Sequence, residues 1–116
     1  MIKTSKTVYD AGSPDDGSRI LVMRLWPRGV RKDAVDEWLR ELGTSLPLIK
    51  EWKGEKIQWA EFKARFLAEM ESPEKRVLIA SLAERSRNET ITLLCGCKDE
   101  SRCHRSILKE LIEGAS

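Results

Sequence analysis

The three cysteines and the single histidine of this 116-residue chain all lie within ten consecutive positions. Cys95, Cys97 and Cys103 supply thiols, and His104 supplies an imidazole that changes its protonation near neutral pH. Thiolates act as nucleophiles and as ligands for soft metals. The segment follows an apolar run over residues 90–94 and precedes a helical pattern. We therefore expect a strand-to-helix loop, of the kind that holds ligands in α/β proteins.

A nucleophilic or redox role is expected for Cys97, which lies in the loop, or for Cys103, at the helix start, where the helix dipole lowers the pKa of a thiol. With His104 as base, the predicted catalytic residues are Cys97, Cys103 and His104. The alternative is structural. Cys95 is expected in the core, because unpaired cysteines are among the most buried residues, and His104 would then cap or orient the loop.

Zinc binding by Cys95, Cys97, Cys103 and His104 is a further interpretation of the same residues. Their types suit zinc, but a C-x-C pair followed by an adjacent Cys-His pair differs from the usual ligand spacings. Neighbouring side chains at a helix start are also expected to diverge. The sequence therefore predicts no metal and no cofactor.

Arginines form the second group with chemistry to offer. Arg24 and Arg28 follow the apolar run 20–23, and Arg102 and Arg105 flank the Cys-His pair. Guanidinium groups bind oxyanions in a bidentate manner, and the N–H groups at a helix start favour anions as well. If the two loops meet, a phosphate or carboxylate site results. The alternative is that these arginines form surface salt bridges with nearby acidic residues.

Trp26 lies in the same basic segment and offers a ring that can stack on a nucleobase, with core packing as the alternative. The predicted ligand-binding residues are therefore Arg24, Trp26, Arg28, Gly29, Arg102 and Arg105.

Apolar patterns predict the elements that position these groups. A short first strand is expected to end at residues 7–9, and two further strands are expected over residues 20–23 and 90–94. Helices are expected over 33–42 and 59–70, from residue 73 and from residue 104, with a short helix or turn over 46–52. The helix over 33–42 rests on Asp33 as N-cap and on the helical spacing of Val35, Trp38, Leu39 and Leu42.

The long helical connection between strands 20–23 and 90–94 indicates that the two strands are parallel. Parallel strands end at the same edge of the sheet, so we expect loops 26–30 and 95–103 to lie side by side. The predicted fold is a small single α/β domain over residues 1–116, with a short, at least partly parallel sheet flanked by helices.

Composition excludes several classes of protein. Lys and Arg number 21 against 19 Asp and Glu, which is too small a surplus for non-specific nucleic-acid binding. The N-terminus lacks the apolar core of a signal peptide, and no apolar run is as long as a membrane span. Three cysteines argue against a disulfide framework, and we expect a cytoplasmic protein.

Residues 17–30, together with Asp36–Leu39 and Trp59–Phe62, resemble the YeaO-like family, domain of unknown function 488. The resemblance spans residues 9–112 and is most specific in Arg24-Leu25-Trp26-Pro27-Arg28-Gly29. The Leu-Leu-Cys strand and the Cys-His-Arg helix start near the C-terminus resemble a sister branch of the same superfamily. The resemblance implies a compact α/β fold and a cytoplasmic location, and it supplies no established reaction.

The leading hypothesis is an arginine-rich anion-binding cleft at the carboxyl edge of the sheet, in a thiol-assisted enzyme that acts on a phosphorylated or nucleotide-like ligand. The alternative is a non-catalytic module that binds a nucleotide or a nucleic acid through the same arginines and Trp26. A metal-stabilised structural domain is the third interpretation. The expected partner is a small anionic ligand and not a membrane, and the sequence leaves enzyme and binding module both open.

Overall fold

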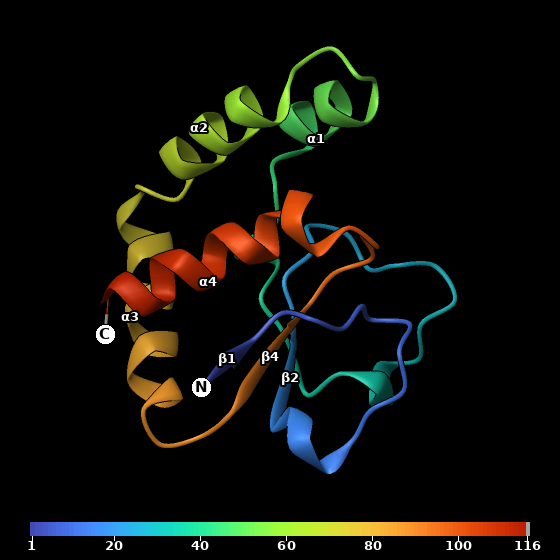
Figure 1. The fold of residues 1–116 in the computed structure, drawn as a ribbon, viewed down its shortest axis with the longest axis vertical. Helices are drawn as coiled ribbons and strands as arrows, with labels where there is room; N and C mark the ends of the chain where they lie inside the picture. Colours follow the sequence, from blue (N-terminus) through green and yellow to red (C-terminus); the bar gives the residue numbers. More distant parts are fainter. Residues whose placement is uncertain (116) are drawn as a thin grey trace.

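A wholly parallel sheet of four strands lies at the centre of the computed structural model, which describes residues 1–115 (Figure 1). Its strands are β1 (Ile2–Lys3), β2 (Ser18–Leu21), β3 (Glu37–Trp38) and β4 (Ile91–Leu94). They are arranged in the order β1-β4-β2-β3, with Ser18 of β2 opposite Ile91 of β4 and Leu21 opposite Leu94. The predicted α/β class and the parallel pairing of these two strands are confirmed.

The two inner strands are buried on both faces, which explains their continuous apolar runs. Alternate side chains point to opposite faces of the sheet. Ile20 and Leu93 contribute to the main core, which also contains side chains of all four helices. Leu21 and Leu94 lie in a smaller cluster with Val8, covered by loop residues rather than by a helix.

Three helices follow β3 in the chain: α1 (Leu46–Lys53), α2 (Trp59–Glu69) and α3 (Pro73–Ser86). The fourth helix, α4 (His104–Ala115), follows β4. Pro47 and Pro73 lie in first turns, where proline is tolerated, and Ser45 caps α1 by accepting a hydrogen bond from the N–H of Leu48. In Figure 1, α1 and α2 lie beyond the carboxyl ends of the strands, whereas α3 and α4 pack together beside the sheet. Among residues 1–115, none of the helices combines the length and the apolar character that crossing a membrane requires.

The predicted helix over 33–42 is wrong. The segment forms a 3-10 turn at Lys32–Ala34, strand β3, and a second 3-10 turn at Arg40–Leu42. The backbone is drawn into the sheet by β2: the N–H of Asp36 donates to the carbonyl of Arg19 at 2.8 Å, and that of Leu39 donates to the carbonyl of Leu21 at 2.9 Å. Pairing with a distant strand therefore overrides the local helical spacing.

The first strand also differs from the prediction, because it spans Ile2–Lys3 and not residues 7–9. Val8 lies in a turn, where its N–H donates to the carbonyl of Cys95 at 3.0 Å. This bond joins the N-terminal segment directly to the cysteine-bearing loop.

Candidate active site

A pocket of about 470 Å³ opens where β2 and β4 end, a volume typical of small-ligand sites. Met23 and Arg24 enter it from the end of β2, and the segment from Cys95 to Cys97 enters it from the end of β4. Side chains of α1 and α2, including Trp52 and Phe62, form an apolar wall. The segments that follow the two inner strands therefore meet at this edge, but through residues 23–25, whereas residues 26–30, which were expected beside the cysteine loop, do not line this pocket.

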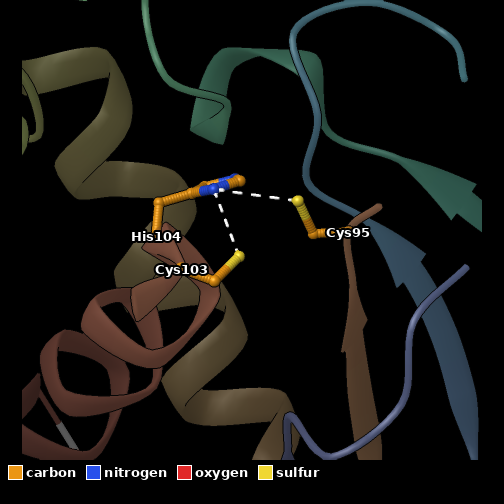
Figure 2. Close-up of side chains that lie close together, drawn as sticks. All are labelled: Cys95, Cys103 and His104. Carbon is orange, nitrogen blue, oxygen red and sulfur yellow. Dashed lines mark hydrogen bonds between the residues drawn. The ribbon is translucent and has the colours of Figure 1, made fainter. Parts of the chain in front are cut away.

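Three sulfur atoms and one ring nitrogen converge on this pocket. The Nδ1 atom of His104 lies 3.9 Å from the Sγ of Cys95 and 3.7 Å from the Sγ of Cys103. The Sγ of Cys97 lies 3.9 Å from that of Cys95. Figure 2 shows Cys95 reaching from the end of β4 toward Cys103 and His104 at the start of α4. Cys95 and Cys103 are buried, and Cys97 is half-buried. We call these four residues the thiol cluster.

The side chains of Cys103 and His104 converge because the two residues have different backbone conformations. Cys103 is extended, with φ −131° and ψ 145°, at the end of a 3-10 turn over Glu100–Arg102, and α4 begins only at His104. Asp99 holds that turn by accepting a hydrogen bond from the N–H of Ser101 at 3.1 Å. The expectation that neighbouring side chains diverge at this helix start is therefore wrong.

A backbone carbonyl fixes which ring nitrogen of His104 carries the proton. Its Nε2 atom lies 2.5 Å from the carbonyl oxygen of Val22, which can only accept a hydrogen bond, so Nε2 carries the proton. Nδ1 is therefore left as an acceptor facing the sulfurs of Cys95 and Cys103. Burial lowers the pKa of His104, and the neutral ring is favoured.

The three thiols compete for a single negative charge. The pKa of Cys95 is lowered to about 3, because Cys103 and then Cys97 hydrogen-bond to its sulfur, with a smaller contribution from the positive charge of Arg105. The pKa of Cys103 is raised by its hydrogen bonds to Cys95 and Cys97 and by burial. For Cys97, a hydrogen bond with Cys103 lowers the pKa, but Cys95 and burial together raise it. The direction of these shifts favours the negative charge on Cys95, whose sulfur receives hydrogen bonds from both other thiols.

Arg105 is completely buried and lies beneath the thiol cluster rather than along the pocket wall. Its Nε donates to the carbonyl of Thr4 at 2.8 Å, and its Nη1 donates to the carbonyl of Cys97 at 2.8 Å. The same Nη1 lies 3.6 Å from the Sγ of Cys103. Arg105 thus joins the N-terminal segment to the cysteine loop and places a positive charge beside the sulfurs.

The other predicted ligand-binding residues are divided between different places. Arg24 and Arg102 line the pocket, together with Lys53 of α1. Arg28 is exposed outside the pocket. Gly29, at φ 81°, lines a separate hollow of about 400 Å³.

Trp26 is engaged in packing. Its ring lies edge-on to that of Trp38, with centroids 5.3 Å apart, and its N–H donates to the carbonyl of Val30 at 2.9 Å. Both the ring and the N–H of Trp26 are thereby engaged by the protein itself, which favours the packing interpretation of Trp26 over stacking on a nucleobase.

Sequence reasoning missed the residues that shape the pocket wall. Trp52 and Phe62, with ring centroids 5.3 Å apart, match helical core positions and give no separate signal. Thr44 lines the pocket, and within residues 1–115 its buried Oγ1 has no hydrogen-bond partner. The neighbouring Gly43 is the residue in the sequence that could have indicated a close approach of this segment to the pocket. A Cβ at position 43 would lie 2.2 Å from the backbone nitrogen of Arg24. The chain can pass this close to Arg24 only with glycine.

Known proteins resemble the chain along most of its length. It is 38% identical over 107 residues to the uncharacterised protein YeaO of Escherichia coli, covering 90% of this chain and 91% of that protein. It is 29% identical over 109 residues to an uncharacterised protein of Mycobacterium tuberculosis, covering 92% and 90% of the two chains. No solved structure matches it. The family model described as the active DUF488-N3 subclade matches residues 2–116. The chain therefore belongs to this subclade of the YeaO-like DUF488 family.

Proposed function

We propose that the protein is a thiol-dependent enzyme that acts on a small anionic substrate of the phosphorylated or nucleotide-like class. The observation that carries this proposal is the convergence of three sulfurs and the acceptor nitrogen of His104 on a pocket that also holds Arg24 and Arg102. Nucleophile, proton acceptor and anion-binding groups are thus present in one place. Three free thiols also fit a reducing compartment, and we propose the cytoplasm.

The nucleophile is supplied by the pair of Cys95 and Cys97, whose sulfurs lie 3.9 Å apart and both line the pocket. Cys103 remains protonated and donates to the charged sulfur, which keeps the negative charge localised at the strand end. Neutral His104 accepts a proton at Nδ1 when a second thiol of the cluster must ionise. Cys103 is therefore a positioning residue in this assignment.

The substrate class follows from the pocket wall. Arg24, Arg102 and Lys53 provide three cationic groups for an anionic end, whereas Trp52 and Phe62 provide an apolar, aromatic surface for the rest of the molecule. A phosphorylated compound with an aromatic or heterocyclic part matches this division. The description of the subclade as active supports a catalytic function over a binding module.

Alkylation by iodoacetamide between pH 5 and pH 8 tests the proposal. Below its pKa of about 8.5, an ordinary thiol reacts roughly tenfold faster for each added pH unit, because only the thiolate reacts. Cys95 is expected to react at a rate that is nearly independent of pH across this range, because its pKa is lowered, whereas the rate at Cys97 should rise with pH and Cys103 is expected to be slow. Mass spectrometry of peptides identifies the modified residue.

A rate that rises tenfold per pH unit at every cysteine would remove the nucleophile. If phosphate or a nucleotide still raised the melting temperature of such a protein, the non-catalytic binding module would become the better account. Protection of the reactive thiol by the same ligand would instead join the anion site to the sulfurs.

A further inference from the structure

We propose that Cys95, Cys97, Cys103 and His104 together bind one soft divalent metal ion of the zinc class, in tetrahedral coordination. This inference goes beyond the proposed function and does not depend on it, since it concerns a second state of the thiol cluster. The unusual order of the ligands in the sequence made such a site unexpected, and the distances now support it.

The spacing of the ligand atoms fits a tetrahedral ion. With bonds of about 2.3 Å to sulfur and about 2.05 Å to nitrogen, two sulfurs on one zinc lie about 3.8 Å apart, and a sulfur and a nitrogen lie about 3.6 Å apart. The sulfurs of Cys95 and Cys97 are 3.9 Å apart. The Nδ1 of His104 is 3.9 Å from the sulfur of Cys95 and 3.7 Å from that of Cys103. Only adjustments of a few tenths of an ångström are needed along these three edges.

The remaining edges divide the four ligands. The ligand atoms of Cys95, Cys103 and His104 all lie within 4.8 Å of one another, whereas the Sγ of Cys97 lies outside this group and has to turn toward it as the ion binds. The four groups come from two neighbouring segments, the chain just after β4 and the start of α4. They therefore do not require a distant segment to move before an ion can bind.

His104 is oriented as a metal-binding histidine is. Such a histidine coordinates through one ring nitrogen while the other donates its proton to a carbonyl or carboxylate, which fixes the ring. Here the Nε2 atom of His104 donates to the carbonyl of Val22 at 2.5 Å, and the lone pair of Nδ1 faces the sulfurs of Cys95 and Cys103.

The charges of the loaded site cancel. One divalent ion with three thiolates and a neutral imidazole has a net charge of −1, and an isolated buried charge is strongly unfavourable. Arg105 is completely buried, and its Nη1 lies 3.6 Å from the sulfur of Cys103. Its positive charge brings the total to zero, and an N–H group beside a metal-bound sulfur supplies the outer hydrogen bond that such sites use.

Binding of the ion forms three metal–sulfur bonds and one metal–nitrogen bond, and it releases to water the protons of those thiols that are still protonated. No oxidation or reduction takes place. All three sulfurs are then occupied, so the metal-bound state and the nucleophilic state of the thiol cluster exclude each other.

Cobalt titration of the reduced, metal-free protein tests the site. We expect one Co²⁺ per chain, with sulfur-to-cobalt charge-transfer bands and the intense visible bands of tetrahedral cobalt. Zn²⁺ is expected to displace it, because zinc binds such sites more tightly. Since all three cysteines of the sequence belong to the cluster, any sulfur-to-cobalt band reports on this site alone.

Two variants and a control make the test specific. Cys97→Ser replaces the half-buried ligand and is expected to weaken cobalt binding by more than the 10- to 100-fold that is typical for loss of an outer partner. His104→Gln provides a second test if circular dichroism shows that it is folded. Lys98→Gln, at an exposed side chain of the same loop, is expected to bind cobalt like the wild-type protein.

Octahedral cobalt without sulfur bands, or wild-type affinity in Cys97→Ser, would overturn the four-ligand site. Neither measurement uses a substrate or an alkylating agent, so its outcome is separate from that of the proposed function. Saturating Zn²⁺ is also expected to protect all three cysteines from iodoacetamide, and rapid alkylation of the zinc-saturated protein would count against the site.

Discussion

Replacing Arg105 with methionine is expected to lower the free energy of unfolding by about 4 kcal/mol. The side chain is completely buried, and its loss leaves the carbonyl oxygens of Thr4 and Cys97 without a charged donor. Each buried acceptor left unsatisfied costs about 1–3 kcal/mol, and breaking a buried charged contact costs about 3–5 kcal/mol. A chain of this size is stable by roughly 6–17 kcal/mol, so the variant is expected to stay folded with roughly 2–13 kcal/mol of stability left, and the loss can be measured.

Urea denaturation at pH 7 measures the difference in free energy, and thermal melting is expected to show a fall of roughly 15 °C at about 4 °C per kcal/mol. Arg102→Met is the matched control, because Arg102 lies in the same loop but is exposed; its effect should stay within about 0.5 kcal/mol. Arg105→Lys keeps the charge but cannot reach all three acceptors, so it should fall between wild type and Arg105→Met. If Arg105→Met had the same free energy of unfolding as wild type, or if Arg102→Met lost as much stability as Arg105→Met, the conclusion that Arg105 holds the N-terminal segment and the cysteine loop together would be refuted.

Three further predictions concern other parts of the molecule. The pKa of Asp16 is lowered by its hydrogen bond with Lys6 despite burial, so the ionised form of Asp16 stabilises the fold. The free energy of unfolding is therefore expected to fall below about pH 4. Asp16→Asn should flatten this dependence in urea titrations at different pH values. Gly43→Ala would place a Cβ 2.2 Å from the backbone nitrogen of Arg24, and a loss of at least about 2 kcal/mol is expected by the same denaturation measurement. Phosphate should raise the melting temperature of wild type and Arg28→Ala alike but of Arg24→Ala less, since Arg24 lines the pocket and Arg28 does not; equal shifts in all three proteins would contradict the pocket as the anion site.

Helical spacing predicts α2, α3 and α4 close to their observed positions, and Pro47 predicts a short helix or turn where α1 lies. Pro47 and Pro73 mark two first turns, and each of these helices contributes apolar side chains to the main core. The same spacing fails over residues 33–42, where the partner of the backbone is a strand near Arg19 and not the next turn. Local patterns do not report such long-range pairing.

In the candidate site, too, some features could be predicted from the sequence and others depend on long-range contacts. Parallel topology predicts that Arg24 and the cysteine loop meet, and they do. The burial of Arg105 was not foreseen, because nothing in the sequence indicates that the carbonyls of Thr4 and Cys97 lie within its reach. The convergence of Cys103 with its neighbour depends on one extended residue before α4, which residue types alone do not specify.

The central position of β4 in the sheet ties folding to the late stages of protein synthesis. β1 and β2 are made early, but they are not neighbours, and each pairs with β4. Until Ile91–Leu94 has been made, β1 has no strand partner and β2 can pair only with β3, and pairing over such separations is slow and entropically costly. Cys95 follows directly after β4 in the chain. A nascent chain that ends before Ile91 thus has neither a closed sheet nor any cysteine, and the scaffold and its reactive sulfurs arise in a single late event.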